Sequence, residues 1–218
     1  RRLPDMRSGH VLAYGLLGLP LAFAALPIYV HVPNYYAQTA GLELAWLGFI
    51  LLAARLFDAG IDPWLGWLAD RLPRRRMLAV ALIPFAIGFG ALLNPAVEHA
   101  ALWLLASLAL TYVGFSAASV AYQAWGADVG EHSALRTRLT AAREGFGLLG
   151  VVLAAALPAV LASDLQQGIA RLSWLLPPIL LLAAAATFSL VGAGRPQIAA
   201  PLPLWPALRQ VMADAVFR

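Results

Sequence analysis

Six long apolar segments, separated by short polar stretches, dominate the pattern of the chain. Each is long enough for an α-helix to cross the hydrocarbon core of a bilayer, which takes about 17–25 residues. Proline, glycine and asparagine stand between the segments, where helices usually end. Because the connections are short, consecutive helices should be antiparallel neighbours. The predicted helices cover residues 11–32, 42–68, 77–93, 101–127, 139–161 and 169–191.

The composition agrees with a surface that faces lipid rather than water. Of the 218 residues, 61% are hydrophobic and only 12% are charged, whereas soluble domains carry about 25% charged residues. The chain has no cysteine, which excludes disulfides and cysteine-ligated metals. The net charge of +4 comes from arginines in short loops between apolar segments, so we expect no nucleic-acid partner. We predict an all-α membrane protein with one six-helix transmembrane bundle in residues 1–193.

The arginines divide very unequally between the two sides of the predicted membrane. Only Arg171 falls on one side, and Arg55 lies inside a predicted helix. The positive-inside rule therefore predicts cytoplasmic termini, and we expect an integral protein of the bacterial inner (plasma) membrane. Residues 194–218 are predicted to be a cytoplasmic linker and the start of a second half. The other thirteen arginines are Arg1, Arg2, Arg7, Arg71, Arg74, Arg75, Arg76, Arg136, Arg138, Arg143, Arg195, Arg209 and Arg218.

The second predicted helix carries three ionisable residues deep within its apolar sequence, Arg55, Asp58 and Asp62. A charge at the bilayer centre costs about 2.5–3.5 kcal/mol on insertion scales, and such residues usually have a function. Their spacing places all three on one helix face. Two carboxylates one turn apart repel each other, and a cation or proton between them relieves the repulsion. Pro63 lacks an N–H, which leaves the carbonyl of Ala59 as a further oxygen ligand.

Two interpretations of these charges remain open, a cation site and a structural ion-pair cluster that joins helices. We favour the cation site, because one arginine cannot neutralise two carboxylates. The loop that follows reads Gly66-x-x-x-Asp70-Arg71-x-x-Arg74-Arg75-Arg76. A glycine here would let a neighbouring helix approach closely. Asp70, at the helix end, should accept hydrogen bonds from the loop arginines or from a facing helix N-terminus.

This loop resembles the signature loop of the major facilitator superfamily, with Pro73 where a glycine is usual. The run from Arg55 to Gly66 resembles the second helix of the glycoside–pentoside–hexuronide:cation symporters, the melibiose permease family. The resemblance implies the N-terminal half of a twelve-helix fold that requires a C-terminal six-helix half. It implies symport of a small-molecule solute, a sugar or glycoside, with a cation. Further similar segments are Tyr35-Tyr36, Gly41-Leu42 and Arg136-Thr137-Arg138-Leu139.

Residue by residue, the resemblance implies that Asp58 and Asp62 bind the coupling cation, as metal ligands if it is Na⁺ rather than H⁺. It also implies that Arg143 binds substrate. On helix four we expect Tyr122 and Trp125 to stack on the solute, with anchoring at the membrane interface as the alternative. No cofactor beyond the coupling ion is expected. The residues assigned to gating are Arg55, Gly66, Asp70, Arg71 and Arg75.

Two alternatives concern the substrate and the reaction. Sugar-transporting relatives carry an acidic residue in the first helix where this chain reads Gly18-Leu19-Pro20. A lysolipid or another amphipathic solute is therefore the alternative substrate. A remote alternative is an intramembrane enzyme, since Gly114-Phe115-Ser116 superficially resembles a rhomboid nucleophile. Its histidine base is absent from residues 169–191, and neither His-Glu-x-x-His nor Gly-x-Ser-x-Gly occurs, so we do not expect an enzyme.

Overall fold

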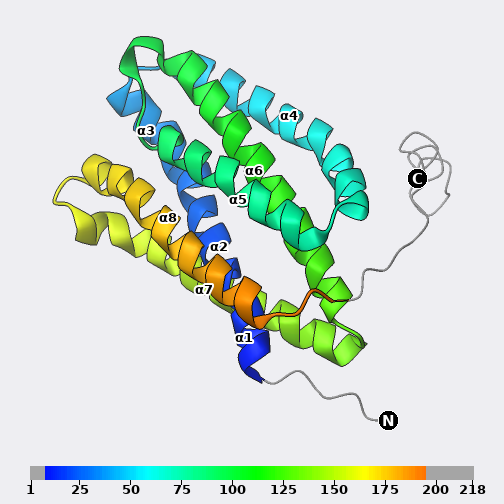
Figure 1. The fold of residues 1–218 in the computed structure, drawn as a ribbon. Helices are drawn as coiled ribbons and strands as arrows, with labels where there is room; N and C mark the ends of the chain where they lie inside the picture. The colour runs from blue at the N-terminus through cyan, green and yellow to red at the C-terminus, as the bar shows by residue number, and fades with distance from the viewer. Residues whose placement is uncertain (1–7, 195–218) are drawn as a thin grey trace, which may run out of the picture.

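The computed structural model describes residues 8–194, and this part of the chain contains six helical spans long and apolar enough to cross a membrane. They pack side by side along a common direction (Figure 1). This confirms the predicted all-α six-helix bundle. The first span consists of α1 (Ser8–Leu16), α2 (Gly18–Leu26), the π-helical turn η1 (Pro27–His31) and α3 (Val32–Thr39). The other spans are α4 (Leu44–Arg71), α5 (Arg74–Leu92), α6 (Ala100–Val129) with the 3₁₀ turn η2 (Val97–His99) before it, α7 (Ser133–Leu161) and α8 (Leu165–Leu190).

The helices extend beyond the apolar segments that predicted them. Helix α4 continues to Arg71 and α5 begins at Arg74, so these loop arginines lie in helical end turns. Helix α7 begins at Ser133, six residues before its apolar segment. Hydropathy marks the membrane-crossing part of a helix, whereas polar end turns in the interfacial layer keep helical hydrogen bonds without any apolar signal.

Close backbone contacts join the first span to α7. A Cβ atom added to Gly15 would lie 2.7 Å from the carbonyl carbon of Ala142, and one added to Gly18 would lie 2.6 Å from the carbonyl oxygen of Arg143. Small residues allow this approach, which supports helix association in a membrane. The α1/α2–α7 contact positions Arg143 next to α2. Helix α6 lies between α4 and α5, with which it packs extensively.

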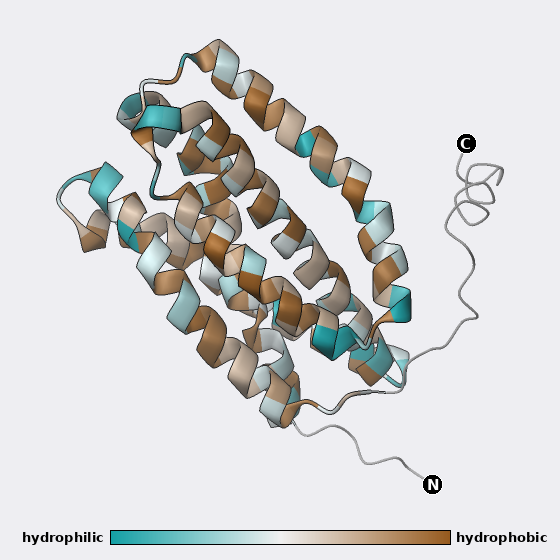
Figure 2. Cartoon of the chain, turned by 45° about the horizontal axis from the view of Figure 1, so that its top comes forward, coloured by the Kyte–Doolittle hydropathy of each residue, from teal (hydrophilic) through white to brown (hydrophobic). Residues whose placement is uncertain are grey.

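The outer faces of α4 and α7 are apolar and exposed in the described part of the chain. They carry Trp46, Phe49, Leu56 and Trp64 on α4, and Leu148, Leu149, Val152 and Val160 on α7. Hydrophobic colour covers long stretches of the helices in Figure 2, and hydrophilic positions gather near their ends. Such surfaces are suited to contact with lipid or with further helices.

The two ends of the bundle differ in charge. Arg138 contacts Ser8, and Trp125 contacts Gly192, so both ends of the described chain lie at the same end of the bundle. Arg74 lies at this end as well, because it pairs with Asp128 in the last turn of α6. Arg171 lies at the opposite end, where its guanidinium donates to the carbonyl of Leu161. The cytoplasmic assignment of the arginine-rich end stays a prediction, and residues 195–218 of the expected linker lie outside the described residues.

Candidate functional site

Asp58 joins α4 to α6. Its Oδ1 accepts a hydrogen bond of 2.8 Å from the hydroxyl of Ser116, and its Oδ2 lies 3.9 Å from Nη1 of Arg55. The side chain of Asp58 is 17% exposed, whereas that of Arg55 is 48% exposed. The predicted Arg55–Asp58 pair is therefore present, but it is long. Each carboxylate oxygen has a different partner.

Asp62 lies one turn further along α4, toward the arginine-rich end, and is exposed. Helix α4 stays helical through Pro63. The Cβ atom of Asp62 should therefore lie about 6 Å from the Cβ atom of Asp58, the usual distance between residues i and i+4. The carbonyl of Ala59 lacks its helical N–H donor, because proline has none. Among the described residues, no three His, Cys, Asp or Glu side chains form a group that could hold a metal ion.

Two tyrosines surround the guanidinium of Arg55, Tyr29 from the first span and Tyr112 from α6. Its Cζ lies 4.2 Å from the ring centre of Tyr29 and 5.4 Å from that of Tyr112. Nη1 of Arg55 donates to the hydroxyl of Tyr29 at 3.3 Å. Tyr29 belongs to the π-helical turn η1, in which the N–H of Val32 bonds to the carbonyl of Pro27. Pro27, the first residue of this turn, and Pro33, just after it, both lack a backbone N–H donor.

A cavity of about 280 Å³ lies between α2, α6 and α7. Tyr122 and Arg143, the predicted substrate residues, line it together with the polar side chains of Ser119 and Gln123. Arg143 pairs with the adjacent Glu144 through Nη2 and Oε1 at 2.6 Å. The remaining lining residues are Gly18, Leu21, Ala22, Ala25, Phe115, Glu144 and Gly147.

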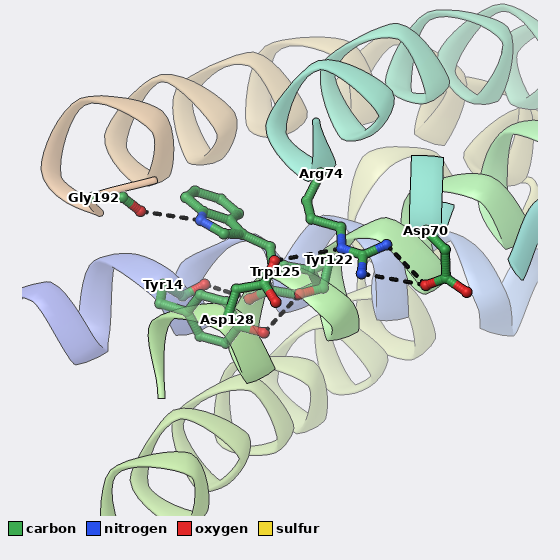
Figure 3. Close-up of polar contacts among 7 residues, drawn as sticks. All are labelled: Tyr14, Asp70, Arg74, Tyr122, Trp125, Asp128 and Gly192. Carbon is green, nitrogen blue, oxygen red and sulfur yellow. Dashed lines mark hydrogen bonds and ion pairs between the residues drawn. The ribbon is translucent and has the colours of Figure 1, made fainter. Parts of the chain in front are cut away.

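A second cavity of about 220 Å³ lies nearer the arginine-rich end and shares Gln123 and Arg143 with the first. Tyr14 lines it, and Tyr14 and Tyr122 are joined by a reciprocal pair of hydrogen bonds (Figure 3). The Tyr14 hydroxyl donates to the carbonyl of Tyr122 at 2.9 Å, and the Tyr122 hydroxyl donates to the carbonyl of Tyr14. These buried bonds hold the first span against α6 beside both cavities.

Arg74 organises a charged cluster at the arginine-rich end. Nη2 lies 3.3 Å from Oδ1 of Asp70, and Nε lies 3.4 Å from Oδ2 of Asp128 (Figure 3). Asp128 is 5% exposed and Arg74 is 14% exposed, whereas Asp70 is 71% exposed. Asp70 thus accepts hydrogen bonds from an arginine of this loop, as expected. Arg71 turns onto the ring of Trp67, with Cζ 3.7 Å from its centre.

Arg75 and Trp125 join the end of α8 to this cluster. Arg75 donates to the carbonyl of Phe188, and its Cζ lies 5.4 Å from the ring centre of Trp125. The indole of Trp125 stacks on Phe188 with centroids 5.7 Å apart and donates from Nε1 to the carbonyl of Gly192 at 3.0 Å. The chain beyond α8 is therefore held beside α6.

Residues 11–215 match the model of a family described as MFS/sugar transport protein. The chain belongs to this family. The expected relation to the major facilitator superfamily is confirmed, and the family is one of secondary transporters of sugar-type solutes. Membership and the six apolar spans together show an integral membrane protein. They point to a transporter rather than an enzyme. In this transporter Ser116, the residue that resembled a rhomboid nucleophile, donates a hydrogen bond to the carboxylate of Asp58.

Two of the predicted site residues lack the expected contacts within the described part of the chain. Trp125 lines neither of the two cavities; it is fully buried among Phe188, Arg75 and Gly192. Gly66 makes no close helix contact among the described residues, since a Cβ atom there would meet nothing within 4 Å. The direction in which Trp125 and Gly66 face depends on how α6 and α4 are rotated in the bundle, and residue type alone does not reveal that rotation.

Proposed function

We propose that this MFS/sugar transport protein is a cation-coupled symporter of the glycoside–pentoside–hexuronide type. Residues 8–194 would form the N-terminal six-helix half, and a C-terminal six-helix half would complete the fold. The contact that carries the proposal is the one between Asp58 and Ser116, because it turns an intramembrane carboxylate inward against α6. A structural ion pair would instead bring the guanidinium of Arg55 into close contact with Asp58, whereas Nη1 lies 3.9 Å from Oδ2.

In this proposal the coupling cation, Na⁺ or H⁺, binds at Asp58 and Asp62. Na⁺ is a hard cation that prefers oxygen ligands. The hydroxyl of Ser116, which contacts Asp58, and the carbonyl of Ala59, which lacks a helical donor, would supply further oxygens. Oδ2 of Asp58, which faces Arg55 at 3.9 Å, is the oxygen open to exchange between the guanidinium and a cation. Binding of the monovalent cation would offset one of the two carboxylate charges and so weaken the attraction between Asp58 and Arg55.

The solute would occupy the cavity between α2, α6 and α7. Gln123 and Ser119 offer hydrogen bonds to hydroxyl groups, and Arg143 offers charged donors. The volume of the cavity, about 280 Å³, is near the lower limit of ligand sites, which measure about 300–1,000 Å³. A second half facing the cavity would enlarge and close it. Its α2 wall is apolar, formed by Leu21, Ala22 and Ala25; this observation keeps a lysolipid or another amphipathic solute as the second candidate.

The cluster around Arg74 would act as the gate at the arginine-rich end. It links the α4–α5 turn to the end of α6 through Asp128. Arg75 and Trp125 extend the link to the end of α8. Alternating access requires such contacts to form in one state and break in the other. We therefore assign Arg74 and Asp128 to the gate in addition to Asp70 and Arg75.

The test is cation-dependent uptake by the full-length protein in sealed vesicles. Asp58→Asn and Asp62→Asn keep the size of the side chain and remove its charge. Losing a buried charged partner costs about 2–5 kcal/mol, a cost that applies to Asp58, whose side chain is 17% exposed, whereas the exposed Asp62 should cost less. Because coupling is reciprocal, cation-stimulated accumulation should be lost in Asp58→Asn and weakened in Asp62→Asn. Solute binding should persist in both variants. Glu98→Gln, in the exposed turn η2, is the matched control. Concentrative, cation-stimulated uptake by both aspartate variants would mean that the carboxylates are structural. Competition between sugars and lysolipids in the same vesicles distinguishes the two solute classes.

A further inference from the structure

The guanidinium of Arg55 is shared between a carboxylate and two aromatic rings. Its Nη1 donates to the hydroxyl of Tyr29 at 3.3 Å, and the same atom is 3.9 Å from Oδ2 of Asp58. The ring centres of Tyr29 and Tyr112 lie 4.2 Å and 5.4 Å from its Cζ. Tyr29 belongs to the first span and Tyr112 to α6, so three separate spans meet at the guanidinium of Arg55.

The distances show which partner holds Arg55. A charge-assisted bond between a guanidinium and a carboxylate usually measures about 2.7–2.9 Å, so the Arg55–Asp58 pair is not closed. The tyrosine hydroxyl is the nearer acceptor. The faces of tyrosine rings attract guanidinium groups within about 6 Å, and both rings fall within that range. Arg55 is therefore held beside Asp58 without occupying it.

We propose that Tyr29 and Tyr112 are positioning residues that set how strongly Arg55 competes with the coupling cation for Asp58. This inference rests on the proposed cation site. The two oxygens of Asp58 have different partners: Oδ1 accepts a hydrogen bond from Ser116, and Oδ2 faces Arg55. With the rings present, Oδ2 stays accessible to a cation. Without them, the guanidinium is free to close on Oδ2 and resist replacement.

The π-helical turn gives Tyr29 its place in this arrangement. The bond from the N–H of Val32 to the carbonyl of Pro27 spans five residues rather than four, which shifts the angular position of the side chains within the turn. Single π turns inside α-helices occur frequently at functional sites. The turn lies in the same span as α2, whose residues line the solute cavity.

The experiment measures the cation concentration for half-maximal uptake by the full-length transporter in vesicles. Tyr29→Leu and Tyr112→Leu remove one ring each, and each should raise this concentration about three- to tenfold, as expected for losing one partly exposed cation–π contact. Tyr29→Phe keeps the ring and loses only the hydroxyl, so its shift should be smaller. Phe57→Leu, an exposed aromatic on α4, is the control and should leave the value unchanged. The KM for the solute at saturating cation should stay constant in all four variants.

An Arg55→Gln background separates positioning from a merely structural role. If the tyrosines act through Arg55, Tyr29→Leu should have no further effect in that background. A shift that persists there, or an unchanged cation dependence in Tyr29→Leu and Tyr112→Leu, would overturn the inference while leaving the cation site intact. Uptake that is independent of any cation in the unmodified protein would overturn the proposed function and the inference together.

Discussion

The gate cluster allows a direct comparison of two carboxylates that share one arginine. Arg74 contacts both Asp128 and Asp70, at 3.4 Å and 3.3 Å. The distances are nearly equal, but Asp128 is 5% exposed and Asp70 is 71% exposed. Exposed ion pairs contribute about 0.2–1 kcal/mol, because water screens them and ordering the side chains costs entropy. Removing one partner of a buried pair costs about 3–5 kcal/mol, since the remaining charge is left desolvated.

We therefore predict that Asp128→Asn lowers the free energy of unfolding by about 3 kcal/mol, near the lower end of that range, because Arg74 keeps Asp70 as a partner. Asp70→Asn should lower it by less than about 1 kcal/mol. The measurement is denaturant unfolding of the full-length transporter in detergent micelles. Double-mutant cycles with Arg74→Gln give the coupling energy of each pair, which should be clearly larger for Asp128.

Two results would refute this reasoning. One is an Asp70→Asn variant that loses as much stability as Asp128→Asn. The other is a coupling energy between Arg74 and Asp128 below about 0.5 kcal/mol, the lower limit for residues in direct contact. Either result would mean that burial does not control the strength of this cluster.

Three further predictions concern packing, topology and the end of α8. Gly15→Ala should cost about 1–3 kcal/mol through overpacking against the α7 backbone, whereas Gly9→Ala, with nothing within 4 Å, should be neutral or stabilising in the same unfolding assay. Arg171→Cys should react with an impermeant thiol reagent on sealed cells, and Arg76→Cys only after permeabilisation; the reverse pattern would invert the predicted topology. Trp125→Phe keeps the ring stack but loses the Nε1 donor, so stability should fall by about 1 kcal/mol. Its solute KM should not change, and a raised KM would place this residue in the substrate site.

Several features of this protein were determined by the sequence alone. The number of spans follows from apolar runs, because a helix that crosses a bilayer needs a minimum length of apolar side chains. The gathering of arginines at one end follows from the alternation of antiparallel helices. The relation to the major facilitator superfamily follows from the loop motif. The pair Arg55–Asp58 was also predictable, because residues three apart on one helix are neighbours whatever surrounds them.

Contacts between helices were decided only by the tertiary structure. Ser116 meets Asp58 and Asp128 meets Arg74 because α6 packs against α4 and α5 with one particular rotation. Trp125 is buried beside Gly192 for the same reason. The position of Tyr29 depends on a π-helical turn. Spacing along a chain defines which residues share one helix face, but the face that each neighbour presents depends on packing between backbones, and no local pattern encodes that rotation.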